Sequence, residues 1–343
     1  KGAYVKKAYM PHYEQIVLRV NPKEAAQRDI VFVRGQRIYT SQRDRPMPMT
    51  PPPFAMVLRK HLRNARLTGV KQVGFDRILA FSFDTKNGER TLIVEVFRDG
   101  NIILVDQENT IIQPLTHASY AGRTLKKGVV YTPPPPAIDP YTLDEAGLKG
   151  MFEDSDRDLV STLGGKVNLG ATHANAVCIL AKHEPNSPCA EADATKIFQG
   201  LRQLLEALSK TEEAHLILKL NDDDGAYWND ALGEMDHGER QRWLGERAVE
   251  ATPILLPQHD NVAHVGFPSL CEAIDAWKGP HDAHALQRRE EEKYEQAGPG
   301  RGQSTEVERL ERRKTQQEKS LASFTEKIEK QQRLGHLIQK HWN

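Results

Sequence analysis

The sequence has no apolar run near the ~20 residues that a membrane-spanning helix needs, so we predict no membrane contact. Its opening residues, KGAYVKKAYM, lack the apolar segment of a secretory signal, and we expect a cytoplasmic protein. They also lack an initiator Met, which suggests a trimmed chain. The three cysteines, Cys178, Cys189 and Cys271, are too few for a disulfide framework and fit a reducing compartment.

Motifs for catalysis and metal binding are also missing. Gly164-Gly165-Lys166 lacks the earlier glycine and the following Ser or Thr of a phosphate-binding P-loop. The sequence contains neither a G-x-S-x-G nucleophile motif nor an H-E-x-x-H zinc motif. Cys178, His183 and Cys189 lie near one another, but their spacing matches no zinc module. We therefore predict no catalytic residue, no cofactor and no metal site.

The formal net charge is zero, but the charges are unevenly distributed along the 343 residues. Residues 1–150 contain 23 Lys and Arg against 14 Asp and Glu, whereas residues 151–300 contain 14 against 27. Residues 301–343 are basic again, with 10 against 6. A basic first half beside an acidic middle is typical of a protein with one face for a polyanion, although ordinary variation among domains is the alternative.

Residues 1–140 read as an antiparallel β-rich domain with one or two helices, which gives an α+β fold class. Strand hairpins are predicted over residues 3–20, 30–40 and 91–106, the last around an Asp-Gly turn. Four consecutive prolines at 133–136 cannot continue a central strand, so they form a stiff connector and mark the domain boundary.

A basic helix is predicted after the three prolines at 51–53, reaching toward Gly69. Its apolar residues recur at spacings of three and four, and they are Phe54, Val57, Leu58, Leu62 and Ala65. Its cations are Arg59, Lys60, Arg63 and Arg66, of which Arg59, Arg63 and Arg66 would share one stripe. This helix leads to Asp76-Arg77 at the edge of a strand that continues through residues 79–83. From the residues alone, the Asp would cap a turn and the Arg would lie over the sheet.

The remaining chain reads as three further regions. Residues 141–215 are helical and contain Gly164-Gly165 and Asn168-Leu169-Gly170, as in a helix-hairpin-helix-like module, with a plain helical pair as the alternative. Residues 216–286 are mixed α/β, with short strands expected at 227–228 and 253–256 and a helix opening at Phe267-Pro268-Ser269. Residues 287–343 read as the start of a coiled coil, whose apolar heptad positions are Val307, Leu310, Leu321, Phe324, Ile328 and Ile338.

The stretch from Phe54 to Ile78 resembles the ribosome quality control family called NEMF or RqcH, also known as NFACT proteins. The family pattern F-x-M-x-L-R-K-x-L, followed by Q-x-G-x-D-R-I, is matched by Phe54, Met56, Leu58-Arg59-Lys60, Leu62, Gln72, Gly74, Asp76-Arg77 and Ile78. Weaker matches include Arg123, Gly128, Tyr131 and Pro133, then Asn168-Leu169-Gly170, and Phe267, Ser269, Glu272, Ala273 and Asp275. Within that family, the resemblance points to the archaeal branch.

The resemblance implies a glycosylase-like first domain and an RNA-binding factor that is not itself an enzyme. Its partners would be rRNA of the large ribosomal subunit and tRNA, including peptidyl-tRNA, with a protein partner reached through the coiled coil. The family recruits aminoacyl-tRNA for untemplated C-terminal tailing of stalled chains, with alanine in prokaryotic members. The implied RNA-binding residues are Arg59, Lys60, Arg63, Arg66, Asp76 and Arg77.

The sequence also departs from the family. Asn175 and Ala176 stand where acidic residues are usual, and an N-terminal helix with a further functional Asp and a C-terminal domain are not in the sequence. Two other functions fit less well. A DNA glycosylase needs an N-terminal nucleophilic amine with an adjacent acid, but the chain begins Lys1-Gly2. A surface fibronectin-binding adhesin needs an export signal.

Overall fold

The computed structural model describes residues 1–120, 122–296, 314–315 and 318. The chain divides into two compact units, Lys1–Arg289 and Glu290–Asn343. The heptad residues from Val307 to Ile338 lie outside the described residues, so the coiled coil stays a prediction.

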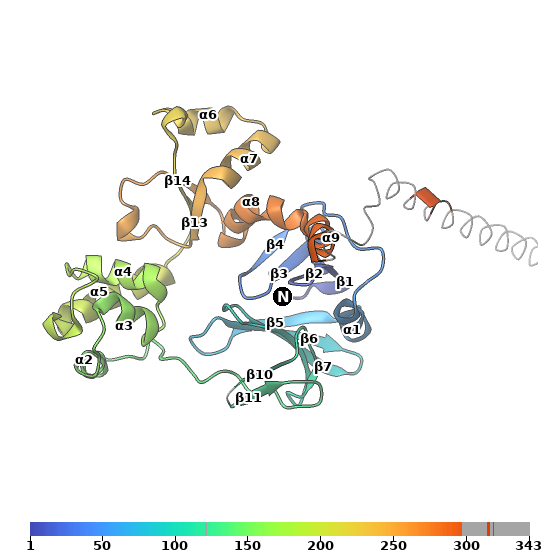
Figure 1. The fold of residues 1–343 in the computed structure, drawn as a ribbon, viewed down its shortest axis with the longest axis horizontal. Coiled ribbons are helices and arrows are strands. Elements are labelled where there is room, and N and C mark those ends of the chain that lie inside the picture. The colour runs from blue at the N-terminus through green and yellow to red at the C-terminus, as the bar shows by residue number, and fades with distance from the viewer. Residues whose placement is uncertain (121, 297–313, 316–317, 319–343) are drawn as a thin grey trace, which may run out of the picture. The chain divides into compact units, whose positions relative to one another are not determined.

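A nine-stranded antiparallel sheet dominates the first part of this unit, and it confirms the α+β class (Figure 1). The strand order is β4-β3-β2-β1-β5-β6-β7-β8-β9. The strands are β1 (Tyr4–His12), β2 (Gln15–Asn21), β3 (Arg28–Val33), β4 (Arg37–Ser41), β5 (Arg66–Gln72), β6 (Ile78–Thr85), β7 (Gly88–Glu95), β8 (Ile102–Asp106) and β9 (Ile111–Pro114). The three predicted hairpins are therefore confirmed as β1–β2, β3–β4 and β7–β8.

The sheet curls over so that its two halves face each other. Phe32 on β3 and Phe81 on β6 have ring centroids 5.1 Å apart in an edge-to-face arrangement. Four steps from strand to strand separate β3 from β6, which in a flat sheet would place them ~19 Å apart. The contact therefore requires strong curvature, and the largest buried cluster fills the space between the two halves.

Helix α1 (Pro53–Leu62) packs against this core through Phe54, Ala55, Leu58 and Leu62. Proline occupies its first turn, as predicted. The predicted continuation to Gly69 is wrong, because Arg63 is extended and Asn64 has a φ of +60°. Beyond that break, the amide of Leu67 donates to the carbonyl of Ala3, and Arg66 begins β5. Pairing with β1 thus prevails over the helical spacing of the apolar residues.

The helices α2 (Glu145–Glu153), α3 (Leu159–Gly165), α4 (Gly170–Leu180) and α5 (Ala194–Ser209) share a separate apolar core. The predicted amphipathic helix corresponds to α5, which buries Ile197, Leu201, Leu204 and Leu205. The turn between α3 and α4 is tight: a Cβ on Gly164 would lie 3.3 Å from the carbonyl carbon of Gly170. The identity of this pair as a helix-hairpin-helix module stays a prediction, as do the predicted domain boundaries.

A three-stranded sheet with its own core follows, formed by β12 (Ala214–Leu218), β13 (Ala248–Thr252) and β14 (His264–Phe267). The helices are α6 (Trp228–Glu234), α7 (His237–Arg247), α8 (Leu270–Ala283) and α9 (Ala285–Gln296). The strands predicted at 227–228 and 253–256 are wrong. Trp228 instead begins α6 and stacks on Trp243 at 5.9 Å. The helix predicted after Phe267 is confirmed, and the Ser269 hydroxyl accepts a hydrogen bond from the Glu272 amide as its cap.

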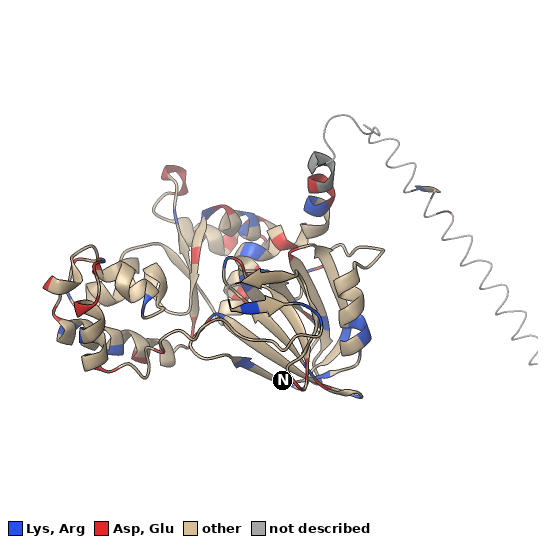
Figure 2. Cartoon of the chain, turned by 60° about the horizontal axis from the view of Figure 1, so that its bottom comes forward, with Lys and Arg blue, Asp and Glu red and all other residues tan. Residues whose placement is uncertain are grey.

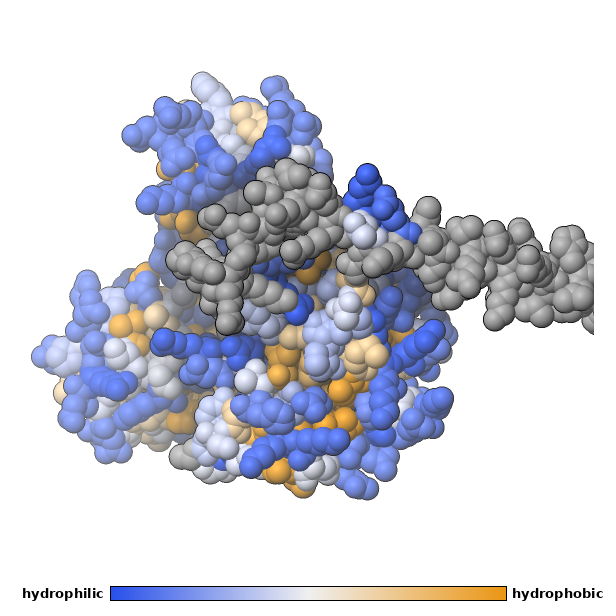
Figure 3. All heavy atoms as spheres, turned by 45° about the vertical axis from the view of Figure 1, so that its right-hand side comes forward, coloured by the Kyte–Doolittle hydropathy of each residue, from blue (hydrophilic) through white to orange (hydrophobic). Residues whose placement is uncertain are grey.

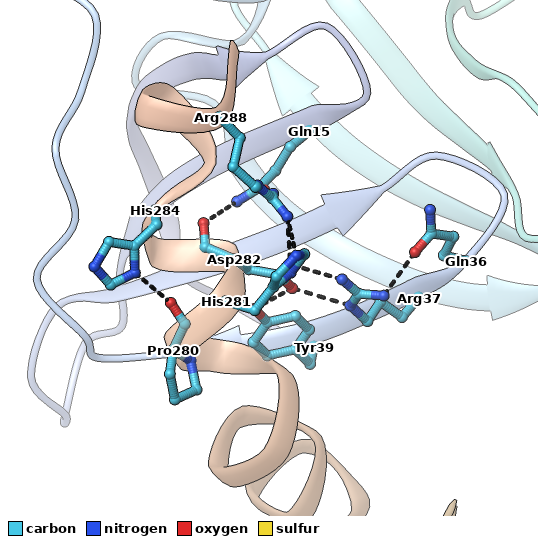
Figure 4. Close-up of polar contacts among 9 residues, drawn as sticks. All are labelled: Gln15, Gln36, Arg37, Tyr39, Pro280, His281, Asp282, His284 and Arg288. Atoms are coloured by element: carbon cyan, nitrogen blue, oxygen red, sulfur yellow. Dashed lines mark hydrogen bonds and ion pairs between the residues drawn. The ribbon is translucent and has the colours of Figure 1, made fainter. Parts of the chain in front are cut away.

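A buried ion pair docks α8 on the β3–β4 hairpin (Figure 4). The Asp282 carboxylate, whose side chain is fully buried, accepts from the Arg37 guanidinium at 2.6 and 2.9 Å. The Tyr39 hydroxyl donates to the same carboxylate at 2.8 Å, and the Gln15 amide donates to the Asp282 carbonyl at 3.1 Å. Burial acts to raise the pKa of Asp282, but its hydrogen bonds and the charge of Arg37 outweigh burial and lower that pKa.

Within the residues that the structure describes, no helix is both long and apolar enough to cross a membrane. The face drawn in Figure 3 is mostly hydrophilic, with hydrophobic residues confined to smaller areas between the polar ones.

Candidate nucleic-acid interface

The predicted site residues lie at opposite ends of the β5–β6 hairpin. At its open end Arg66 pairs with Asp84, and near its tip Gln72 pairs with Leu79. The strand rises ~3.3 Å per residue, so these two ends are about 20 Å apart. Arg59, Lys60, Arg63 and Arg66 come together at the open end, and Asp76-Arg77 forms part of the tip. The sequence therefore identified two surfaces, which the structure does not bring together.

The open end carries a basic concavity of about 690 Å³, which we call the α1 basin. It is lined by Tyr4, Arg59, Lys60, His61, Arg63, Asn64, Ala65, Arg66, Asp84, Thr85, Lys86 and Asn87. A neighbouring hollow of about 580 Å³ between β1 and α1 shares three of these cations and adds Lys6 and Lys7. Sequence reasoning missed Lys6, Lys7 and Lys86, because they come beside α1 only through strand pairing. The pairing of β1 with β5 places Lys6 and Lys7, and the pairing of β5 with β6 places Lys86.

The cations of the α1 basin differ in whether other groups of the protein already contact them. Arg59 donates from Nε to the Ala8 carbonyl at 2.7 Å, and its guanidinium lies 5.3 Å from the centre of the Tyr9 ring. Lys60, Arg63 and Arg66 are exposed, and no carboxylate of the described residues forms a salt bridge with them. Their charges are therefore available to a ligand. Lys and Arg are seen around α1 in Figure 2.

The pKa of His61 reflects the positive charge around the α1 basin. Its pKa is lowered, first by burial and then by the positive charges of Lys60, Arg90 and Lys127. The imidazole thus feels three cations that come from α1, β7 and the segment after β11 (Arg123–Leu125). A bound anion would oppose that repulsion and raise the pKa of His61.

Asp76 and Arg77 belong to the turn at the tip, not to a strand. Gly74 has a φ of +61°, which a glycine adopts without strain and which lets the chain reverse there. The Arg77 amide donates to Asp76 Oδ1 at 2.6 Å, so the carboxylate caps the turn, as expected from the residues alone. The Arg77 side chain is exposed, and no described acidic residue forms a salt bridge with it. Its guanidinium can therefore present a planar set of donors to a phosphate.

A second concavity of about 850 Å³ lies beside the tip, and we call it the tip pocket. Its lining includes Asp76, Arg77, Phe97, Arg98, Asp99, Tyr120, Arg123 and Pro133, Pro134, Pro135 and Pro136. Guanidinium groups, carboxylates and two aromatic rings thus surround one hollow. That combination is suited to an unpaired nucleotide, whose base can stack and whose phosphate needs cations.

A buried carboxylate supports one wall of the tip pocket. Glu95 is fully buried and accepts from Arg123 at 2.5 and 3.2 Å and from the Tyr131 hydroxyl at 3.0 Å. Arg123, from β11 (Arg123–Leu125), also lies 4.9 Å from the ring centre of Tyr120 in β10 (Ala118–Tyr120). Arg123 and Tyr131, which match the family pattern, both donate to Glu95, and this shared partner explains why they occur together. Glu95 itself gave no signal in the sequence, since it reads as an ordinary strand residue.

Comparison with known proteins identifies relatives of this chain. The model of NFACT N-terminal and middle domains matches residues 1–343. The archaeal Rqc2 homolog aRqcH of Methanocaldococcus jannaschii is 27% identical over 344 residues, covering 97% of this chain and 46% of that protein. Ribosome quality control complex subunit 2 of Saccharomyces cerevisiae is 41% identical over 99 residues, covering 29% of this chain and 9% of that protein.

The chain thus spans less than half the length of these curated relatives. Among solved structures, the fibrinogen binding protein from Staphylococcus aureus superimposes with a TM-score of 0.60 at 19% identity, covering 80% of this chain and 91% of that one. This likeness concerns the fold alone. Because the family model matches the whole sequence, the chain belongs to the family that carries the NFACT N-terminal and middle domains.

Proposed function

We propose that this chain is the RNA-binding part of a ribosome quality control factor. It binds large ribosomal subunits that still hold peptidyl-tRNA, in the cytoplasm, and recruits aminoacyl-tRNA for untemplated C-terminal tailing with alanine. Peptide bonds form on the ribosome, so the chain contributes binding and no catalytic residue. Family membership and the names of the relatives, which are ribosome quality control proteins, support this proposal.

The observation that carries the proposal is the spacing of two cationic surfaces on one rigid hairpin. Lys60, Arg63 and Arg66 lie at one end of β5–β6, and Arg77 lies about 20 Å away at the other, at ~3.3 Å per strand residue. A small anion can meet only one end. A folded RNA of tRNA size carries phosphates over a much longer distance and can contact both ends at once.

The residues have distinct roles in this proposal. Arg59, Lys60, Arg63 and Arg66 neutralise backbone phosphates at the α1 basin. Arg77 contacts a phosphate at the tip, where Asp76 accepts from a base or ribose donor. Each phosphate contact releases counterions, so the affinity falls steeply with salt. The α3–α4 module and the coiled coil from residue 287 add contacts to the ribosome or to a protein partner.

Charge reversal at exposed positions tests the proposal. Lys60→Glu with Arg63→Glu, and Arg77→Glu alone, each should strongly weaken tRNA gel shifts and co-sedimentation with large subunits at moderate salt. Lys149→Glu on α2 is the matched control for Arg77→Glu, because it makes the same change of charge on an exposed residue outside both surfaces. Unchanged binding in both sets of variants, with folding verified by circular dichroism, would remove the basis for this function.

A further inference from the structure

The residue just before Asp76 is bonded to the helical region. The side-chain amide of Asn168, in the turn between α3 and α4, donates to the carbonyl of Phe75 at 2.7 Å. The ring of Phe75 also meets the ring of Tyr141 edge-on, with centroids 6.1 Å apart. Figure 1 shows the β5–β6 hairpin pointing toward these helices. One residue of the tip is thus contacted through both its main chain and its side chain by a segment distant in sequence.

Both contacting residues are themselves firmly anchored. Asn168 lies between Val167 and Leu169, which are buried in the core of the α2–α5 helices. Tyr141 is fixed through its carbonyl, which accepts from Arg202 on α5 at 3.0 Å. The helical region therefore holds the main chain of both residues, and it presents the Asn168 amide and the Tyr141 ring to Phe75.

The backbone conformation explains only in part why asparagine stands at position 168. Its φ of +58° is left-handed, and Asn is among the few residues that tolerate this conformation. Glycine would meet that requirement equally well. Glycine would not supply the amide that bonds Phe75, so the side chain has a second role.

The three successive carbonyls of the tip are all bonded. The Phe75 carbonyl accepts from Asn168, that of Asp76 accepts from the Gln72 amide at 2.8 Å, and that of Arg77 accepts from the Val96 amide at 2.7 Å. Two of these bonds come from the sheet to which the tip belongs. The bond from Asn168 is the one that joins the tip to the helices.

We propose that Asn168 is a positioning residue that fixes the orientation of Asp76 and Arg77 toward RNA. The inference rests on the proposed function, because it concerns the same tip. Asn168 does not touch the ligand; it restricts the tip, so that Arg77 meets its phosphate without a loss of conformational freedom on binding. The helical region and the Asp-Arg pair consequently act as one rigid binding unit.

The test compares Asn168→Gly, which keeps the left-handed backbone and removes the amide, with Asn261→Gly as a matched control. Asn261 is another left-handed Asn, with a φ of +62°, in the segment between β13 and β14; it is exposed, whereas Asn168 is half-buried. Loss of one hydrogen bond predicts about three- to tenfold weaker tRNA binding by Asn168→Gly and no change by the control. Hydrogen exchange of the tip amides at residues 75–77 should rise in Asn168→Gly alone.

A double-mutant cycle separates positioning from a general structural effect. In an Arg77→Ala background, Asn168→Gly should weaken tRNA binding less than about twofold, because the group it positions is gone. An equal loss in both backgrounds, or unchanged exchange at the tip, overturns the inference and leaves the proposed function intact. If Arg77→Ala by itself leaves tRNA binding unchanged, the tip is not an RNA contact and both proposals fail at that site.

Discussion

Removing the Asp282 carboxylate should destabilise the docking of α8 more than an average substitution would. Asp282→Ala leaves the Arg37 guanidinium, with a side chain only 16% exposed, without its bidentate partner and leaves the Tyr39 hydroxyl without an acceptor. Breaking a buried ion pair by removing one partner costs about 3–5 kcal/mol, because the remaining charge is left uncompensated. We expect a loss of that size in the free energy of unfolding.

Removing the charges together should cost less than the two single losses combined. Arg37→Met leaves a buried Asp282 carboxylate and is therefore costly, whereas Arg37→Met with Asp282→Leu replaces the pair by apolar groups of similar volume. Adding Tyr39→Phe removes the hydroxyl that would otherwise lack an acceptor. We expect a coupling energy of about 2 kcal/mol or more between positions 37 and 282.

Urea unfolding followed by tryptophan fluorescence measures these effects. Three of the four tryptophans, Trp228, Trp243 and Trp277, lie in the part of the chain that α8 completes, and Trp277 is on α8 itself. The matched control is Glu272→Ala, which removes an exposed carboxylate from the first turn of the same helix. If the costs of the Arg37 and Asp282 substitutions simply add within about 0.5 kcal/mol, the pair is not coupled and our account of the docking is wrong.

Four further predictions follow from single contacts. The folded-state pKa of Asp282 is depressed, so its contribution to stability is present above the unfolded pKa and is lost as the pH falls through the folded pKa. Tryptophan fluorescence should therefore report weaker α8 docking below about pH 4, and Asp282→Ala should not show this transition. Leu58→Ala, at a fully buried position of α1, should cost about 2–5 kcal/mol in urea unfolding and weaken tRNA binding at the α1 basin only in proportion to the unfolded fraction. Glu95→Ala should lower the melting temperature through a loss of about 3–5 kcal/mol and should increase proteolysis near the proline connector, since Arg123 and Tyr131 both lose their shared acceptor; unchanged cleavage would contradict this role. Gly100→Ala should destabilise by about 1–3 kcal/mol, because a Cβ there would clash with the backbone carbonyl of Glu95, and a melting temperature equal to that of the unsubstituted protein would refute the clash.

Elements with local signals were predictable from the sequence. The hairpins around Gly35 and Asp99-Gly100 follow from turn residues between alternating strands, and α5 follows from its apolar spacing. The end of α1 was not predictable, because it depends on pairing between Leu67 and Ala3, which are far apart in sequence. The strand predicted at 227–228 was wrong for the same reason, because Trp228 stacks on Trp243 from another helix.

The candidate site was predictable in its charges and not in its geometry. Arg59 to Arg77 is a short stretch of sequence, and it reads as one surface. In the structure, β5 carries the chain about 20 Å between the two groups at ~3.3 Å per residue. The bond from Asn168 to Phe75 joins residues 93 positions apart, and no local pattern announces such a contact.

The place of β1 in the sheet has a consequence for folding. The first strand of the sequence lies in the interior of the sheet order, between β2 and β5, and Tyr4 pairs with Arg66. During synthesis, the β1–β4 portion would leave the ribosome with one side of β1 unpaired until about 30 more residues, up to the end of β5, had emerged. Closing the long loop between β1 and β5 is slow. An exposed strand edge invites association with other chains during that interval. A nascent copy of this protein is therefore most vulnerable to aggregation before β5 has left the ribosome, and slower translation of the segment between β4 and β5 would lengthen its exposure.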